Sequence, residues 1–162
     1  DQLVASARSL QPLAELADVD VIALDQGSED VVERVHQLNR NTLFLAEQLR
    51  DHPAVEKVFH PGECENFKDL QRPGAGHGCL LSFELKGGTP SAQKVYDALE
   101  VCKGPSLGTA FTLVCPYVLL AHYDELVWAK RCEVPSHLLR VSVGLEEQPD
   151  LWKRFLLALD SA

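Results

Sequence analysis

Apolar residues recur at helical spacing over residues 28–51. They return every three or four positions, so the pattern predicts a helix that buries one face. Ser28 is expected to cap this helix, because a serine hydroxyl can accept a hydrogen bond from a free N–H of the first turn. Pro53 is expected to stop it. The expected apolar face consists of Val32, Val35, Leu38, Leu45 and Leu49.

Three shorter helices are predicted further along the chain. One begins at Thr89, since Pro90 suits the first helical position. A second covers residues 116–130, and a third runs from about Pro149. The residues expected to face inward are Ala92, Val95 and Leu99 in the first helix, Tyr117, Leu120 and Val127 in the second, and Leu151, Phe155 and Leu159 in the third.

Short apolar or alternating patterns predict strands at residues 55–59, at 79–85, at 101–103 and around Arg140. A long glycine-rich loop separates the first two. Strands divided by helices and a long loop, without regular β-α alternation, predict an α+β fold. We expect a small antiparallel-type sheet of about four strands, with helices layered on one side.

The first 27 residues differ from the rest. A short helical pattern is broken at Pro12, and an irregular acidic stretch follows as far as Gly27. We interpret residues 1–27 as a connector or the tail of a preceding unit, and residues 28–162 as a separate domain. The chain starts at Asp1 and contains no methionine, so we expect it to be part of a longer protein.

Composition and charge limit the classes of function. The net charge is −9 and no basic run occurs, so nucleic acid and anionic membranes are poor partners. Five cysteines without a Cys-x-x-Cys pair indicate reduced, mostly buried thiols in a cytosolic protein. The six histidines show no helical i, i+4 pairing, so we predict no metal site.

The strand around Arg140 carries the first candidate for chemistry. Leu139, Val141 and Val143 point to one side of this strand, and Arg140 and Ser142 point to the other. A guanidinium on a rigid strand can grip a planar anion through two parallel hydrogen bonds. The alternative is a solvated arginine on the open face of the sheet.

A turn with two glycines, at residues 104–109, is the second candidate. Consecutive backbone N–H groups in such a turn can converge on an anion. The alternative, which this segment taken alone favours, is a plain corner between two strands.

Several segments occur in an order that resembles a known family. They are Ser106-Leu107-Gly108, the stretch from Leu139 to Glu146, the stretch from Asn39 to Gly62, and His122 sixteen residues after Ser106. Together they resemble the C-terminal domain of the cystathionine gamma-synthase and gamma-lyase family. Its members are fold-type I pyridoxal-phosphate (PLP) enzymes of cysteine and methionine metabolism. The resemblance implies that residues 28–162 are the C-terminal small domain of such an enzyme, and that residues 1–27 are a connector or the tail of its large domain. The residues from Lys103 to Thr109 look most like those of the synthase branch.

The resemblance implies roles for particular residues. Arg140 matches the arginine that binds the substrate's α-carboxylate; Ser106 matches the serine beside it, and the Leu107 N–H is a second nearby donor. These three are the expected substrate-binding residues. The resemblance implies no catalytic, cofactor-binding or metal-binding residue in this chain, because the PLP lysine belongs to the large N-terminal domain. The chain alone is therefore expected to be inactive.

For the complete protein, the resemblance implies a cytoplasmic homo-oligomer that makes cystathionine from an O-acylhomoserine and cysteine, a step of transsulfuration in methionine biosynthesis. The alternatives are lyase-type C–S elimination, and a non-catalytic module for amino-acid binding or assembly. The expected partners are a small-molecule amino-acid substrate and the large PLP domain, with neither nucleic acid nor membrane.

The sequence also departs from the family pattern. Pro105 replaces a side chain that faces the distal part of the substrate, Phe111-Thr112-Leu113 replaces Glu-Ser-Leu, and Ala121 replaces a threonine. These changes leave the choice of substrate open. Lys103 does not lie in the Ser-x-x-Lys context of the cofactor lysine and is interpreted as a structural or surface residue. His122 is interpreted as a packing histidine, with direct proton transfer as the alternative.

Overall fold

In a computed structural model, residues 17–161 are described, and the chain divides into two units, Asp1–Glu33 and Arg34–Ala162. The predicted helical pattern before Pro12 lies outside the described residues. The described part of the first unit contains helix α2 (Asp18–Ser28), so the prediction of an irregular acidic stretch is wrong. Asp18 and Asp20 lie in its first turn, where acidic side chains interact favourably with the helix dipole.

Helix α3 (Val31–Asp51) starts three residues later than predicted. The Ser28 hydroxyl does not cap it, because this hydroxyl donates to the carbonyl of Asp25 within α2 at 2.8 Å. The C-terminal half of the predicted apolar face is confirmed, since Leu45 and Leu49 are buried. Val32 and Val35 are exposed, so the predicted face is too long.

The second unit is built on a five-stranded sheet, counted over the described residues, with the order β1-β2-β5-β4-β3. β1 (Val55–Phe59), β2 (Leu80–Leu85), β5 (Leu139–Ser142) and β4 (Leu113–Pro116) pair antiparallel, and β3 (Cys102–Lys103) pairs parallel with β4. The predicted α+β class is confirmed, with one more strand than expected and a mixed sheet.

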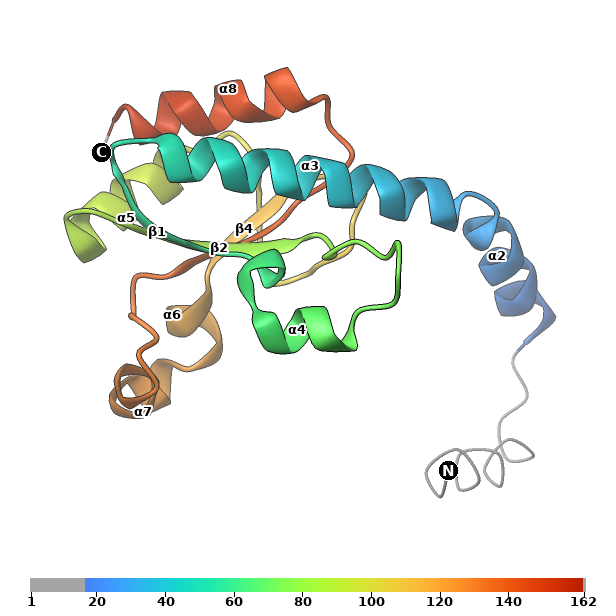
Figure 1. Cartoon of the computed structure of the whole chain (residues 1–162), viewed down its shortest axis with the longest axis horizontal. Helices are drawn as coiled ribbons and strands as arrows, with labels where there is room; N and C mark the ends of the chain where they lie inside the picture. Colours follow the sequence, from blue (N-terminus) through green and yellow to red (C-terminus); the bar gives the residue numbers. More distant parts are fainter. Residues whose placement is uncertain (1–16, 162) are drawn as a thin grey trace. The chain divides into compact units, whose positions relative to one another are not determined.

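Helices cover one face of this sheet. In Figure 1, α3 and α8 (Gln148–Leu159) run over it, and residues of α3, α5 (Gly88–Ala98) and α8 share one buried cluster with the strands. Phe83 of β2 meets Phe155 of α8 edge-on, with 6.4 Å between ring centroids. The inward residues predicted for these two shorter helices are all buried, namely Ala92, Val95 and Leu99, and Leu151, Phe155 and Leu159.

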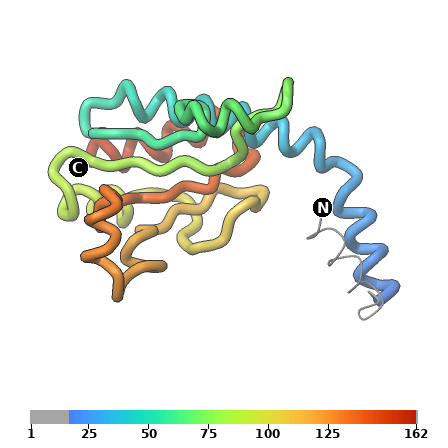
Figure 2. Tube along the Cα trace, turned by 60° about the horizontal axis from the view of Figure 1, so that its bottom comes forward, coloured from blue at the N-terminus to red at the C-terminus, as the bar shows by residue number. Residues whose placement is uncertain are grey.

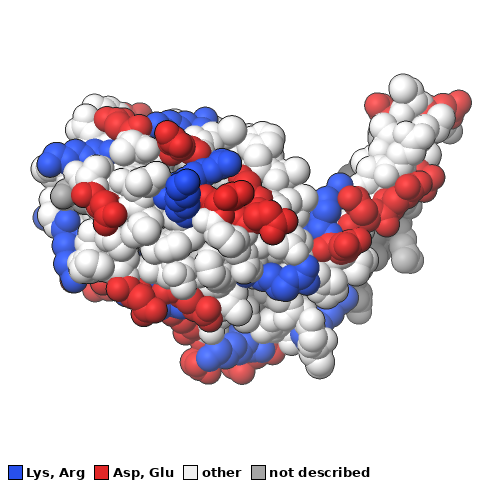
Figure 3. Space-filling model, turned by 90° about the horizontal axis from the view of Figure 1, so that it is seen from above, with Lys and Arg blue, Asp and Glu red and all other residues white. Residues whose placement is uncertain are grey.

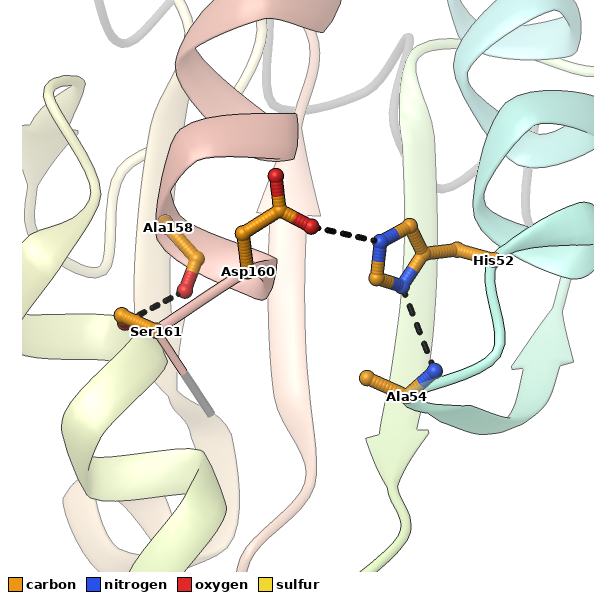
Figure 4. A network of polar contacts seen from close by, with 5 residues as sticks. All are labelled: His52, Ala54, Ala158, Asp160 and Ser161. Carbon is orange, nitrogen blue, oxygen red and sulfur yellow. Dashed lines mark hydrogen bonds and ion pairs between the residues drawn. The ribbon is translucent and has the colours of Figure 1, made fainter.

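The ends of α3 and α8 are also joined by a polar contact. His52 follows α3 and lies 3.5 Å from the Asp160 carboxylate beyond α8, while its other ring nitrogen accepts from the Ala54 N–H (Figure 4). The outer face formed by the two helices carries acidic and basic side chains interspersed (Figure 3). Mixed charge of this kind is typical of a solvated helix face.

The prediction of one continuous helix over residues 116–130 is wrong, although two short helices occur within this range. The chain first forms strand β4, and then α6 (Tyr117–Ala121), a 3-10 turn η3 (Tyr123–Glu125) and α7 (Leu126–Arg131). His122 interrupts the helix, because its φ of −135° and ψ of 32° are not helical. As a result Leu120 and Val127 are 52% and 71% exposed, against the prediction that they are buried.

The long loop after β1 contains two short helices, η2 (Pro61–Glu63) and α4 (Glu65–Leu70). The five cysteines are free, but the prediction that most are buried is wrong. Cys115 of the inner strand β4 is buried, whereas Cys64, Cys102 and Cys132 lie at loops or at the sheet edge and are exposed. Within residues 17–161, no helix is long and apolar enough to cross a membrane.

Candidate functional site

Arg140 lies in the middle of the sheet. It pairs with Ser82 of β2 on one side and with Cys115 of β4 on the other. Its neighbours Leu139 and Val141 belong to the core beneath the helices, so Arg140 projects from the opposite face. Ser142 shares this face but is buried. The face around Arg140 is therefore partly covered rather than openly solvated.

Three features define the surroundings of the guanidinium. Its Nη2 donates to the carbonyl oxygen of Pro105. Its Cζ lies 5.3 Å from the centroid of the Tyr117 ring. Its Nε is buried and has no hydrogen-bond partner among the described residues. Arg140 is thus half-buried and held by its neighbours, and the alternative of an arginine extended into bulk water does not describe it.

The glycine-flanked corner lies beside this strand, and two hydrogen bonds fix it there. Pro105 accepts from Arg140, and the Gly108 N–H donates to the Ser142 hydroxyl at 3.0 Å. In Figure 2 the yellow trace of this segment runs close to the red-orange trace of β5. Ser106 and Leu107 lie between the two fixed points, and both are exposed. All three predicted substrate-binding residues therefore occupy one region.

A cavity of about 710 Å³ opens beside Arg140. Its walls are mainly apolar and come from β1, β2, α6 and the segment before β5; they include Phe59, Leu80, Leu81, Tyr117, Val134 and Leu138. Arg140 contributes a positive charge to the wall, and Glu63 and Glu133 contribute negative ones. Neither Ser106 nor Leu107 lines it. A cavity of this kind suits a small organic ligand whose anionic group meets Arg140.

His60 forms another part of the wall and is itself buried. Its Nδ1 accepts from the Gly62 N–H at 3.2 Å, so the proton of the neutral ring belongs on Nε2. Burial lowers the pKa of His60, and the positive charges of His77 and Arg50 add to this effect. The His77 ring packs edge-on against it at 5.3 Å. His60 is therefore a neutral packing group at the base of the loop.

His122 makes polar contacts with two side chains, and its ring also lies 6.1 Å from that of Trp128, measured between centroids. Its Nδ1 lies 2.8 Å from the Glu125 carboxylate, and its Nε2 lies 3.3 Å from the Tyr117 hydroxyl. The apolar pattern predicts Tyr117 to be a core residue and does not predict its place over Arg140. Helical periodicity contained no signal for that place, since it depends on how β4 pairs with β5.

A buried polar cluster supports the end of β5. Glu146 accepts from both the N–H and the hydroxyl of Thr112, at 2.6 and 2.8 Å. The Thr112 hydroxyl also accepts from the Gly144 N–H at 2.9 Å, and Asn41 of α3 donates to the Gly144 carbonyl at 3.0 Å. The cluster joins α3, the residue before β4 and the segment after β5, and so fixes the strand that carries Arg140.

Comparison with known proteins places the sequence in a family. A family model described as the Cys/Met metabolism PLP-dependent enzymes matches residues 14–160. The chain belongs to this family. It is 44% identical to cystathionine gamma-synthase of Neurospora crassa over 146 residues, which is 88% of the chain and 23% of that protein.

Further relatives include both synthases and lyases. Cystathionine gamma-synthase of Saccharomyces cerevisiae is 36% identical over 88% of the chain and 24% of the relative, and L-methionine gamma-lyase of Porphyromonas gingivalis is 30% identical over 91% of the chain and 38% of the relative. The chain thus spans about a quarter of the length of the synthases that it matches. The resemblance of the sequence to the PLP enzymes of cysteine and methionine metabolism is confirmed.

Family membership implies PLP, but the lysines of this chain do not fit its attachment. All seven are exposed: Lys57, Lys68, Lys86, Lys94, Lys103, Lys130 and Lys153. A lysine that forms a Schiff base needs a lowered pKa, which burial or a neighbouring cation provides. Lys103 instead donates to the Asp97 carbonyl at 3.1 Å and lies over the Tyr96 ring. The described residues offer no attachment point for the cofactor.

Proposed function

We propose that this chain is the C-terminal domain of a PLP-dependent transsulfuration enzyme, and that it binds the α-carboxylate of the amino-acid substrate through Arg140. The observation that carries the proposal is the half-buried guanidinium at the wall of an apolar cavity, held between Tyr117 and Pro105. Binding a carboxylate in a fixed place orients the rest of the amino acid, which is a positioning role.

The Pro105 carbonyl marks where an anionic ligand would interact. A carbonyl oxygen now accepts from Arg140 Nη2. A carboxylate is the stronger acceptor for a guanidinium, and it can accept two parallel hydrogen bonds. We propose that the substrate carboxylate replaces this carbonyl, and that the Ser106 hydroxyl and the Leu107 N–H of the same corner provide neutral donors. Ser106 and Leu107 are exposed and available for such contacts.

For the complete protein we propose cystathionine gamma-synthesis, in which the acyl group of an O-acylhomoserine is replaced by the sulfur of cysteine. The 44% identity to the Neurospora crassa cystathionine gamma-synthase favours this reaction. Lyase-type C–S elimination is the second candidate, favoured by the 30% identity to an L-methionine gamma-lyase. PLP acts as the electron sink in such reactions. We propose that a lysine outside this chain holds it, because the seven lysines here do not suit that role.

Variants of Arg140 in the complete protein test this function. We expect Arg140→Ala to lower kcat/KM by on the order of 10²-fold or more, because a charged anchor is lost. Arg154→Ala is a matched control, since Arg154 lies on α8 and contacts the Glu100 carbonyl. Unchanged kinetics for Arg140→Ala would remove Arg140 from the site.

Two further measurements test whether catalysis requires a cofactor-binding domain in addition to this chain. The 162-residue chain mixed with PLP is expected to give neither Schiff-base absorbance nor turnover. The coding sequence upstream of Asp1 is expected to encode a large domain with a cofactor lysine. An unrelated domain there would favour the non-catalytic module for amino-acid binding or assembly. A robust catalytic rate from the 162-residue chain alone would contradict the proposal.

A further inference from the structure

We propose that Tyr117 is a positioning residue for Arg140, and that His122 and Glu125 hold Tyr117 in place. The inference rests on the proposed function only for its effect on substrate binding; the positioning itself can be measured without substrate.

The first step is the contact between the ring and the cation. The Arg140 Cζ lies 5.3 Å from the Tyr117 ring centroid, within the range of cation–π attraction. The Pro105 carbonyl holds Nη2 of the same guanidinium. Two neighbours from different elements thus restrict one long side chain. A guanidinium fixed before the ligand arrives loses less conformational entropy on binding, which increases affinity.

The second step is what fixes the backbone of Tyr117. It directly follows β4, where Cys115 pairs with Arg140 and Pro116 pairs with Leu139. The Tyr117 N–H donates to the Leu138 carbonyl at 3.1 Å, which continues the contact with the strand of Arg140. The position of the Tyr117 backbone relative to Arg140 is therefore set by the register of the sheet.

The third step is what fixes its side chain. The Tyr117 hydroxyl lies 3.3 Å from His122 Nε2, and His122 Nδ1 lies 2.8 Å from the Glu125 carboxylate. A carboxylate at Nδ1 favours the proton on that nitrogen, which leaves Nε2 free to accept from the tyrosine hydroxyl. The rings of Tyr117 and His122 also pack edge-on, with 5.4 Å between centroids.

The interruption of the helix explains how these side chains meet. In a regular helix, residues five positions apart do not share a face as residues three or four apart do. His122 leaves the helical conformation at the end of α6, and its side chain contacts Tyr117, which is five residues earlier. An uninterrupted helix over this segment, as the apolar pattern predicts, would not place the imidazole on the tyrosine hydroxyl.

The arrangement forms a continuous chain of contacts from Glu125 through His122 and Tyr117 to Arg140. A purely structural role would require only that the Tyr117 side chain fills space between its neighbours. Among the described residues, no contact joins His122 to Arg140 directly. A positioning role therefore requires, in addition, that a change at His122 alters the mobility of the Arg140 guanidinium.

The first test is solution NMR on the full 162-residue chain without ligand. The Arg140 Nε–H signal, assigned by its loss in Arg140→Lys, reports how firmly the guanidinium is held, because Nε is buried. We expect Tyr117→Leu to speed exchange of this proton with water by roughly 10-fold or more. His122→Ala keeps the Tyr117 ring but removes the partner of its hydroxyl, so this variant is expected to speed exchange by a smaller factor. His36→Ala, a change on the exposed face of α3, is the control.

The second test is the steady-state kinetics of the complete protein. We expect Tyr117→Leu to raise KM for the amino-acid substrate roughly 3- to 30-fold, the range that a cation–π contact provides, with a smaller effect on kcat. Tyr117→Phe keeps the ring and loses the hydroxyl, so its KM is expected to rise less. Should Tyr117→Leu fail to fold, His122→Ala and Tyr117→Phe carry the same comparison.

The outcomes separate the two proposals. If Arg140→Ala leaves the kinetics unchanged, the proposed function fails, while the exchange rates still decide whether Tyr117 positions Arg140. Alternatively, Arg140→Ala abolishes binding, while Tyr117→Leu and His122→Ala leave both the exchange rate and KM as in the wild type. In that case the positioning role of Tyr117 is overturned, and the proposed function of Arg140 stands.

Discussion

Thr112 and Glu146 are joined by two hydrogen bonds, one from the backbone N–H of Thr112 and one from its hydroxyl, to the two oxygens of the Glu146 carboxylate. Thr112 directly precedes β4, so the Glu146 carboxylate is engaged with the chain at the start of that strand. This contact links the start of β4 to the segment after β5 and so steadies the strand that carries Arg140.

Replacement of Thr112 by valine tests this link. Thr112→Val keeps the side-chain volume but removes a donor to Glu146 and the acceptor of the Gly144 N–H. Thr112 is 1% exposed, so water cannot readily replace these partners. We expect a loss of about 1–3 kcal/mol in the free energy of unfolding, measured by urea denaturation. Thr89→Val, at an exposed position of α5, is expected to change it by less than about 0.5 kcal/mol.

A side chain at Gly144 is predicted to clash with the neighbouring backbone. A Cβ atom there would lie 2.5 Å from the backbone carbon of Phe111, which cannot move without displacing the chain before β4. We expect Gly144→Ala to destabilise the fold by about 1–3 kcal/mol, as other overpacked sites do. Gly104→Ala is the control, since its Cβ would lie 3.9 Å from the nearest atom, Leu113 Cδ2. Equal melting temperatures for the two variants would contradict the steric argument.

The helical spacing of apolar residues correctly predicted the helices that bury one regular face. The helices α5 and α8 each place apolar residues at steps of three or four, and their predicted inward residues are buried. The run from Leu113 to Pro116 was missed as a strand, because a short, continuously apolar segment has no period that separates a buried strand from a helix. The apolar run continues beyond Pro116 into aromatic and aliphatic residues, so the pattern predicted one long helix there, which is incorrect.

The candidate site could be predicted only in part. From the residue pattern alone, Arg140 was a candidate anion-binding group, with a solvated arginine as the alternative. Its substrate-binding role, like those of Ser106 and Leu107, followed from the family resemblance. The contacts of Arg140 with Pro105 and Tyr117 join residues more than twenty positions apart. Such contacts depend on strand order and register, which the local pattern of residues does not contain.

The cysteines are predicted to differ in reactivity. Burial raises the pKa of the Cys115 thiol, partly offset by the nearby charge of Arg140, so this thiol stays protonated and protected. Cys64, Cys102 and Cys132 are exposed. We expect iodoacetamide to alkylate these three in the folded protein and Cys115 only after denaturation in urea, as measured by peptide mass spectrometry. Labelling of Cys115 in the folded protein at the rate of the exposed thiols would show that β4 opens readily.

The last prediction concerns acid stability and follows from His60. Burial, His77 and Arg50 lower the pKa of His60 in the folded protein below its ordinary value of 6.5. Above about pH 6.5 the ring is neutral in both the folded and the unfolded chain, and it has no effect on the pH dependence. Below that pH the unfolded chain takes up the proton first. Stability is therefore expected to fall with pH from about 6.5 down to the lowered pKa.

His60→Asn isolates this contribution, because the asparagine oxygen can still accept from the Gly62 N–H but the side chain does not titrate. The free energy of unfolding, measured in urea at several values between about pH 5 and 8, is expected to depend less steeply on pH below 6.5 in this variant than in the wild type. His36→Asn, at an exposed position of α3, is expected to keep the steeper wild-type dependence. If His60→Asn and the wild type lose stability in parallel as the pH falls, the acid sensitivity of the fold originates at other groups, and His60 is protonated without cost in the folded chain.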